Sequence, residues 1–290
     1  MRTTFHARQP YAELFLRLAR EFHNESPARP TRFMKMMETN QGSIAGITGG
    51  SLDEDGLERK NPVIVGLGDS VTAGHFESLI TMTPQELMDA MKELMANPQA
   101  AGERPKMDVE ITDARESYLE KFRLRLIDKY ERTSVSTINA GIAGDHLIQM
   151  AKRLDRDVIR YQPDLVLING SLNWDSSMGT AGEYKEILRQ MTRRIKTETD
   201  ADLILLTPNG DLPNRVFFGD AAPQPTTPKR VEKIRELAAE ENVCLADVYA
   251  VWELAGENKC PWEELLANKV NHPGIEGHEV YAEVLMKLFE

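Results

Sequence analysis

The sequence predicts an α/β protein in which a mostly parallel sheet carries helices on both faces. Short aliphatic runs that end in glycine, Val63–Gly68 and Asp164–Gly170, are typical of strands buried on both faces. Segments with apolar residues at helical spacing, such as 115–131 and 181–197, alternate with these runs. Because parallel strands need crossover connections, usually helices, this alternation favours repeated β–α units in one sheet.

Size and charge narrow the possible classes of protein. The chain has 290 residues, of which 41% are hydrophobic, and this suits a sizeable core. Acidic residues outnumber basic ones by 46 to 35, so the formal net charge is −11. An acidic surface disfavours nucleic acid and anionic membranes as partners.

The sequence further indicates a soluble protein of the cytoplasm. Residues 1–10 contain no apolar segment of the kind found in signal peptides. No apolar run approaches the roughly 20 residues that a membrane span needs. Cys244 and Cys260 match no metal or redox spacing, and two reduced thiols are favoured over a disulfide between them.

Residues 1–60 are interpreted as an N-terminal helical extension packed on a main domain of residues 61–290. Apolar residues every four positions predict a helix over residues 10–24, and residues 33–37 predict a second, short helix. Ser51 follows a short apolar run and a glycine pair, so it imitates a nucleophile turn. We interpret it as a decoy, because no second set of catalytic partners follows it.

Residues 81–112 are interpreted as a helical insertion in the main domain. Thr83 and Glu86 form a capping box, with Pro84 at the first helical position. The methionines that follow at helical spacing are more typical of core packing than of a flexible lid.

Helices and strands follow one another regularly in the rest of the chain. The predicted helices are residues 115–131, 145–160, 181–197, 229–241, short helices within 249–267, and 275–289, and the predicted strands are residues 134–138, 164–170, 202–207 and 243–248. A loop rich in proline and glycine, residues 208–228, interrupts the series.

Ser70 stands at the carboxyl end of the first strand of the main domain. Two glycines before it allow the backbone to turn sharply. In open α/β sheets the carboxyl ends of the parallel strands meet at one edge, where ligands bind. We therefore expect Gly144, Asn173 and His272, which lie in later loops, to reach the same edge as Ser70.

These four residues form a coherent set for acyl transfer. A serine hydroxyl is a weak nucleophile that needs a base, and the imidazole of His272 can provide one. The oxyanion of the tetrahedral intermediate needs fixed donors, which the main-chain amides of Ser70 and Gly144 and the side chain of Asn173 would provide. No cluster of histidines, cysteines and carboxylates suggests a metal, so neither a metal nor a cofactor is expected.

Over residues 62–290 the sequence resembles the SGNH (GDSL-type) hydrolases. Four motifs stand in the order of that family: Gly68–Ser70, Asn139–Asp145, Gly170–Asn173, and Val270–Pro273 with Gly277 and His278 after it. The resemblance places Ser70 at the nucleophile, Gly144 and Asn173 at the oxyanion hole and His272 at the base. It implies a flavodoxin-like three-layer α/β/α sandwich with about five parallel strands.

The chain departs from the family pattern where the acid of the catalytic triad usually stands. That acid lies a few residues before the histidine, but here Lys269 stands three before His272 and Asn268 four before. We predict a Ser–His dyad in which the amide oxygen of Asn268 or a main-chain carbonyl orients the imidazole. The alternative is a carboxylate from elsewhere, such as Asp247 at the end of the last strand.

The third motif also departs from the pattern. Trp174 follows Asn173 where the family usually has aspartate, and Asp175 comes next. We predict that both line the substrate pocket, where the tryptophan would stack on a sugar, although a core position suits it equally. Asp69 and His75, on either side of the nucleophile turn, are assigned to the same pocket.

The sequence thus favours a serine esterase of the SGNH type that acts on a small soluble ester. Short-chain acyl esters, above all O-acetyl groups on carbohydrates, are the expected substrates. A lipase, phospholipase or thioesterase acting on longer acyl chains is the enzymatic alternative. The departure at the triad acid leaves room for a non-catalytic carbohydrate-binding relative, and no pattern in the sequence indicates the oligomeric state.

Overall fold

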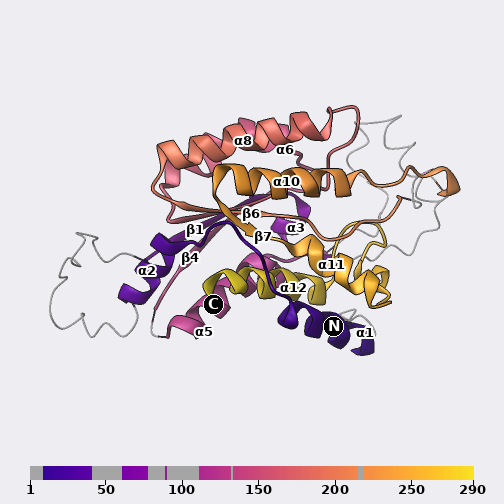
Figure 1. Cartoon of the computed structure of the whole chain (residues 1–290), viewed down its shortest axis with the longest axis horizontal. Helices are drawn as coiled ribbons and strands as arrows, with labels where there is room; N and C mark the ends of the chain where they lie inside the picture. Colours follow the sequence, from indigo (N-terminus) through magenta and orange to yellow (C-terminus); the bar gives the residue numbers. More distant parts are fainter. Residues whose placement is uncertain (1–8, 41–60, 78–88, 90–110, 132, 215–218) are drawn as a thin grey trace, which may run out of the picture.

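Five parallel strands form the central sheet, in the order β4-β1-β5-β6-β7. The computed structural model describes residues 9–40, 61–77, 89, 111–131, 133–214 and 219–290 (Figure 1). The strands are β1 (Val63–Gly68), β4 (Ser136–Gly141), β5 (Leu165–Asn169), β6 (Asp202–Leu206) and β7 (Cys244–Ala246). Each pair of neighbours runs parallel, which confirms the predicted α/β class and three-layer arrangement.

Helices cover both faces of this sheet. Figure 1 shows one layer of helices above the strands and another below them. The first layer contains α6 (Leu147–Lys152), α8 (Ala181–Glu198) and α10 (Thr227–Glu241), and the second contains α1 (Gln9–Glu21), α5 (Tyr118–Tyr130), α11 (Val248–Glu257) and α12 (Ile275–Met286).

The alternation of side chains along each strand divides the core between the two layers. Val65, Val166 and Leu203 pack with the α6–α8–α10 layer. Their chain neighbours Ile64 and Leu165 pack with the opposite layer. Because successive side chains of a strand point to opposite faces, a run of aliphatic residues serves both halves of the core.

The described part of residues 1–60 packs against the second helical layer. Phe15 of α1 meets Trp252 of α11 edge to face, with ring centroids 4.6 Å apart. Phe33 of α2 (Thr31–Asn40) packs on Phe289 in the C-terminal turn η6 (Lys287–Phe289), at 6.1 Å. The division of the chain at residue 60 stays a prediction.

The segment after α1, which includes Asn24 and Ser26, covers β7, the edge strand of the sheet. The side-chain amide of Asn24 donates to the carbonyl of Leu245 (2.8 Å), and its oxygen accepts from the amide of Asp247 (3.0 Å). The hydroxyl of Ser26 accepts from the amide of Leu245 at 2.9 Å. These side chains supply the partners that a sixth strand would otherwise offer, and they block pairing with another chain.

Two predicted helices differ from the structure. The helix expected over 145–160 is broken into α6, α7 (Leu154–Asp157) and η3 (Ile159–Tyr161), because the backbone leaves helical geometry at Arg153 and again at Val158. The insertion expected over 81–112 ends in a strand, since β3 (Ile111–Thr112) pairs antiparallel with β2 (His75–Glu77). Ser51 and the capping box at Thr83 and Glu86 lie outside the described residues.

Short helical turns complete the described structure. They are α3 (Ser70–Ala73), η2 (Ala114–Glu116), η4 (Gly219–Ala221) and η5 (Trp262–Leu265). Cys244 and Cys260 are free and buried, and burial raises the pKa of Cys244 to about 12. Within the described residues, no helix has the length and apolar character to span a membrane.

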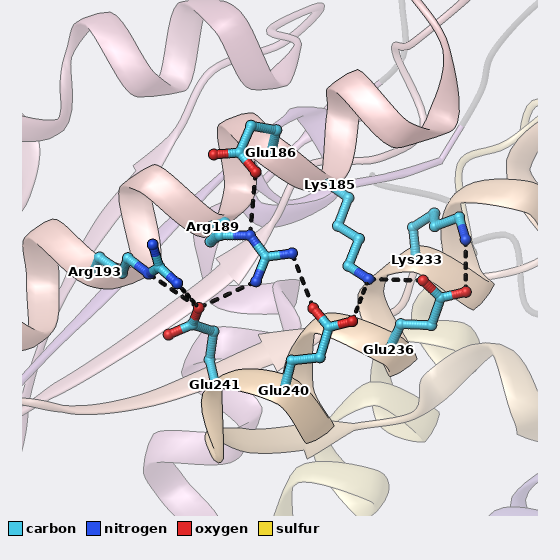
Figure 2. Close-up of polar contacts among 8 residues, drawn as sticks. All are labelled: Lys185, Glu186, Arg189, Arg193, Lys233, Glu236, Glu240 and Glu241. Carbon is cyan, nitrogen blue, oxygen red and sulfur yellow. Dashed lines mark hydrogen bonds and ion pairs between the residues drawn. The ribbon is translucent and has the colours of Figure 1, made fainter.

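A network of ion pairs joins α8 to α10 on the outer surface of the first layer (Figure 2). Arg189 lies at its centre, 2.9 Å from Glu240, 3.2 Å from Glu241 and 3.1 Å from Glu186. Lys185 contributes two further pairs, at 2.7 Å each, to Glu236 and Glu240. Isolated surface pairs contribute little to stability, but a cation shared by three carboxylates is less easily replaced by water.

We expect Arg189→Met to lower the free energy of unfolding by about 1 kcal/mol, because it removes the charge and keeps the apolar stem. Urea unfolding at low salt and in 1 M NaCl measures this, and the loss should shrink in high salt. Arg156→Met is the control, since Arg156 is 60% exposed and pairs with Asp157 alone among the carboxylates described. An equal loss for both variants would contradict the expectation.

Candidate active site

The turn after β1 brings Ser70 to the carboxyl edge of the sheet. Asp69 is the N-cap of α3, and its Oδ1 accepts from the amide of Val71 at 3.0 Å. Gly68 permits the sharp turn, because a Cβ there would lie 2.0 Å from the hydroxyl of Thr72 and 2.6 Å from the carbonyl of Asn169. The strand therefore ends directly beneath the helix that begins with the serine.

Ser70 and His272 meet across 202 residues of sequence. The Oγ of Ser70 lies 2.7 Å from the Nε2 of His272, which is hydrogen-bond distance. When Nε2 accepts the serine proton, the neutral imidazole carries its own proton on Nδ1. A serine whose hydroxyl contacts an imidazole nitrogen in this way can be deprotonated as it attacks.

The two residues predicted for the oxyanion hole besides Ser70 lie on adjoining loops. Gly144 has φ +77°, and apart from its chain neighbours no atom of the described residues lies within 4 Å of where a Cβ would be. The side-chain amide of Asn173 donates to the carbonyl of Asp145, the residue after Gly144, at 3.0 Å. The structure thus brings these two residues together, and their oxyanion role stays a prediction.

Arg153 holds the ends of the neighbouring strands together beneath the site. Its buried guanidinium donates to the carbonyl of Gly68 (2.9 Å), the carbonyl of Ala140 (2.7 Å) and the carboxylate of Asp145 (2.6 Å). It also pairs with Asp157 at 2.8 Å. The sequence does not single out this residue, because at helical spacing Arg153 falls away from the apolar stripe of the predicted helix and resembles the other basic residues of that segment.

Asn139 and Gly141, both in the second motif, contact the turn that carries Ser70. The side chain of Asn139 donates to the carbonyl of Thr72 at 2.8 Å and accepts from the amide of Gly141 at 2.9 Å. A Cβ on Gly141 would lie 2.2 Å from the amide nitrogen of Ala73, so only glycine allows β4 to approach α3 this closely.

Two further histidines, His75 and His278, lie near the Ser70–His272 pair. The ring of His75 lies beside that of His272, with centroids 5.2 Å apart. His278 is fully buried; its Nδ1 accepts from the amide of Tyr118 (3.2 Å), and its Nε2 donates to the carbonyl of His75 (2.8 Å). These two bonds fix one neutral tautomer and make His278 part of the support for β2.

The residues considered for orienting the imidazole have other partners. The carboxylate of Asp247 is bound by Arg235 at 2.7 Å and by the hydroxyl of Thr207 at 2.9 Å. Lys269 has φ +56°, and its side chain pairs with Glu264 on the surface. A carboxylate at position 269 would follow the same backbone direction, toward the surface.

The side chain of Asn268 contacts the main chain of the loop that carries His272. Its Oδ1 accepts from the amides of Val270 (3.0 Å), Asn271 (2.9 Å) and His272 (2.9 Å). To orient the imidazole the sequence predicts either a main-chain carbonyl or this oxygen. The structure places it against the backbone, because the left-handed turn at Lys269 folds the following amides around it.

The four residues assigned to the substrate pocket have different positions. Asp69 has no exposed surface, so it does not line an open pocket. Trp174 is 4% exposed and packs edge to face on Tyr184, in agreement with a core position. Trp174 and Asp175 also line a cavity of about 240 Å³, together with Lys229 and Arg230. His75 lies beside His272, as described above.

The chain belongs to the GDSL-like Lipase/Acylhydrolase family, which matches residues 67–280. The class of the protein is therefore a GDSL-type hydrolase. A comparison with curated proteins found no match.

Several solved structures share the fold. Axe2, an acetylxylan esterase from Geobacillus stearothermophilus, is 19% identical over 78% of this chain and 93% of that chain, with a TM-score of 0.54. A lipase/acylhydrolase from Enterococcus faecalis is 22% identical over 78% and 95%, with a TM-score of 0.53. LAE5, an α/β hydrolase from the metagenome of Lake Arreo, Spain, is 20% identical over 78% and 94%, with a TM-score of 0.54.

Burial shifts two groups of the site in opposite directions. It lowers the pKa of His278 from 6.5 to about 4 and raises the pKa of Asp69 from 3.8 to about 6. Between pH 6.5 and 4 the unfolded chain protonates its histidine first, so acid destabilises the fold through His278. Between pH 6 and 3.8 the folded chain protonates Asp69 first, so acid stabilises the fold through this carboxyl.

We expect these two contributions, about 3 kcal/mol each, to oppose one another in the wild-type protein. His278→Gln should therefore lose less stability than wild type between pH 6.5 and 4, and Asp69→Asn should lose more. Urea unfolding at four or five pH values in this range measures the slopes. Parallel stability curves for wild type and both variants would refute the assignment.

Proposed function

We propose that the protein is a serine esterase that hydrolyses short-chain acyl esters with Ser70 as nucleophile and His272 as base. The observation that carries the proposal is the 2.7 Å contact between Ser70 Oγ and His272 Nε2 at the carboxyl edge of the sheet. Gly144 and Asn173 adjoin on the neighbouring loops, in a chain of the GDSL family.

The reaction follows from these positions. Ser70 Oγ attacks the ester carbonyl while His272 Nε2 takes the serine proton. The amides of Ser70 and Gly144 and the side chain of Asn173 donate to the oxyanion. Collapse of the intermediate breaks the bond to the alcohol, which leaves with the proton from His272. Water then attacks the acyl-enzyme, again losing its proton to His272, and frees the carboxylic acid and Ser70.

A Ser–His dyad is the form of the catalytic group that we propose. The positions before His272 hold Asn268 and Lys269 in place of the usual acid, and Asp247 is bound by Arg235. In a triad the acid holds the imidazole in the correct tautomer and orientation, so in a dyad other groups have to hold the histidine.

For the substrate we propose O-acetyl groups on carbohydrates. Axe2 is an acetylxylan esterase of the same fold. The similar lipase/acylhydrolase from Enterococcus faecalis supports longer acyl chains as the alternative. The free, buried cysteines and the net charge of −11 support a cytoplasmic protein that acts on a small ester and not on nucleic acid.

Ser70→Ala should abolish hydrolysis of p-nitrophenyl acetate, since it removes the hydroxyl that contacts the proposed base. Release of p-nitrophenol and labelling by a fluorophosphonate probe measure this, with acetate-to-palmitate esters and acetylated xylo-oligosaccharides as the substrate series. Wild-type protein that neither turns over an ester nor reacts with the probe would favour a carbohydrate-binding relative. Activity that persists in the pure variant would exclude Ser70 as nucleophile.

Asn173→Ala should lower kcat about 10²–10³-fold and leave KM nearly unchanged, because it removes a donor that acts on the transition state. Steady-state kinetics with p-nitrophenyl acetate measure the change. Asn258→Ala is the control, since Asn258 is an exposed residue at the end of α11. A rise in KM without loss of kcat would assign Asn173 to substrate binding instead.

A further inference from the structure

The loop that carries His272 is fixed by hydrogen bonds along its whole length. The amide of Ala267 donates to the carbonyl of His272 (2.8 Å), and the amide of Gly274 donates to the carbonyl of Leu265 (2.7 Å). The amide of Leu212, in the loop after β6, donates to the carbonyl of Val270 at 2.7 Å. The backbone around the base is thus tied to a neighbouring loop as well as to itself.

The side chain of Asn268 binds the main chain of the turn that leads to His272. One oxygen, Oδ1, accepts the amides of the three residues that lead to the base, including the amide of His272 itself. The Nδ2 of Asn268 donates to the side-chain oxygen of Asn271 at 3.0 Å. Loss of this side chain would leave three amides to find water, and the turn would gain freedom immediately before His272.

Asn209 holds the opposite side of the loop from within the core. It has no exposed surface, and its Nδ2 donates to the carbonyl of Asn271 (2.9 Å) and to that of Gly210 (2.7 Å). Its main-chain amide donates to the hydroxyl of Tyr281 (2.7 Å), and that hydroxyl donates to the Oδ1 of Asn209 (2.9 Å). Every polar group of the Asn209 side chain is thereby engaged, so the amide cannot rotate without breaking buried bonds.

Tyr281 also links this arrangement to the nucleophile turn. Its ring stacks on that of Tyr118, with centroids 4.9 Å apart. The hydroxyl of Tyr118 bonds the hydroxyl of Thr72 in α3, the helix that begins with Ser70, at 2.9 Å. Thr72, Tyr118 and Tyr281 are all fully buried, so one dry polar layer contacts both the serine helix and the histidine loop.

We propose that Asn209, Asn268 and Tyr281 are positioning residues for the base: together they hold the main chain of His272 at the place where Nε2 meets Ser70. The inference rests on the proposed function, because it matters for turnover only if His272 is the base. It assigns to backbone support part of the work that a carboxylate behind the imidazole performs in the usual triad. Proton transfer is sensitive to this support, since a displacement of about 1 Å can cost 10²-fold in rate.

The test compares Asn268→Ala, Asn268→Asp and Tyr281→Phe with wild type. Asn268→Ala and Tyr281→Phe should lower kcat for p-nitrophenyl acetate about 10–100-fold with KM within twofold, because they loosen the base and leave the substrate pocket intact. Asn268→Asp should restore kcat to within about threefold of wild type, since the carboxylate still accepts the three amides.

Tyr130→Phe is the matched control for the loss of a buried hydroxyl. The hydroxyl of Tyr130 has no hydrogen-bond partner within the described residues, and it lies at the far end of α5. This variant should keep the kcat of wild type. An Asn268→Ala variant with kcat within twofold of wild type, or an Asn268→Asp variant no better than Asn268→Ala, would overturn the inference.

The imidazole NMR signal of His272 tests the inference separately from turnover. His272→Gln assigns the signal in wild-type protein, and Asn268→Ala should then shift it toward that of a free histidine and broaden it. An unchanged signal overturns the inference even if the protein is an active esterase. Wild-type protein without esterase activity would overturn the proposed function alone, since the NMR result would still decide whether these residues hold His272.

Discussion

The close approach of α3 to the ends of β1 and β4 is the constraint on which the site depends. Gly68 and Gly141 lie opposite one another in the register of these two strands. At both positions a Cβ would collide with the helix, at 2.0 Å from Thr72 and 2.2 Å from Ala73. The two glycines therefore allow the serine helix to sit directly on the strand ends, and Arg153 and Asn139 then bond the carbonyls that this arrangement exposes.

His272 reaches this edge from the loop before α12, in the second helical layer. Its loop is held between α12 and the loop after β6, through the bonds of Asn209 and Leu212. Burying a polar side chain lowers stability unless the side chain is hydrogen-bonded. Here the hydrogen bonds of buried side chains join elements that lie far apart in the sequence. The distance between Ser70 and His272 is thus a property of the packing of both layers on one sheet.

The chain belongs to the GDSL family but has Asn268 and Lys269 before His272, where the family usually has an acid. Residues of the first, second and fourth motifs meet in space. The turn before His272 is built around Asn268 and a left-handed Lys269, whose side chain pairs with Glu264 at the surface. Support of the main chain and support of the imidazole are different ways to hold a histidine in place, and the buried side chain of Asn209 and the side chain of Asn268 bond the main chain.

The sequence by itself determined the strands, most of the helices, the parallel sheet and the identity of Ser70, Gly144, Asn173 and His272 as the candidate set. These follow from hydrophobic periodicity and from motifs whose residues lie close together in the chain. Tertiary packing set the break in the helix at Arg153, the pairing of Ile111–Thr112 with β2, and the hydrogen bonds of Asn209, Asn268 and Tyr281. These features depend on contacts between residues far apart in the sequence, or on the left-handed turn at Lys269, which residue types alone do not specify. No local sequence pattern could therefore predict them.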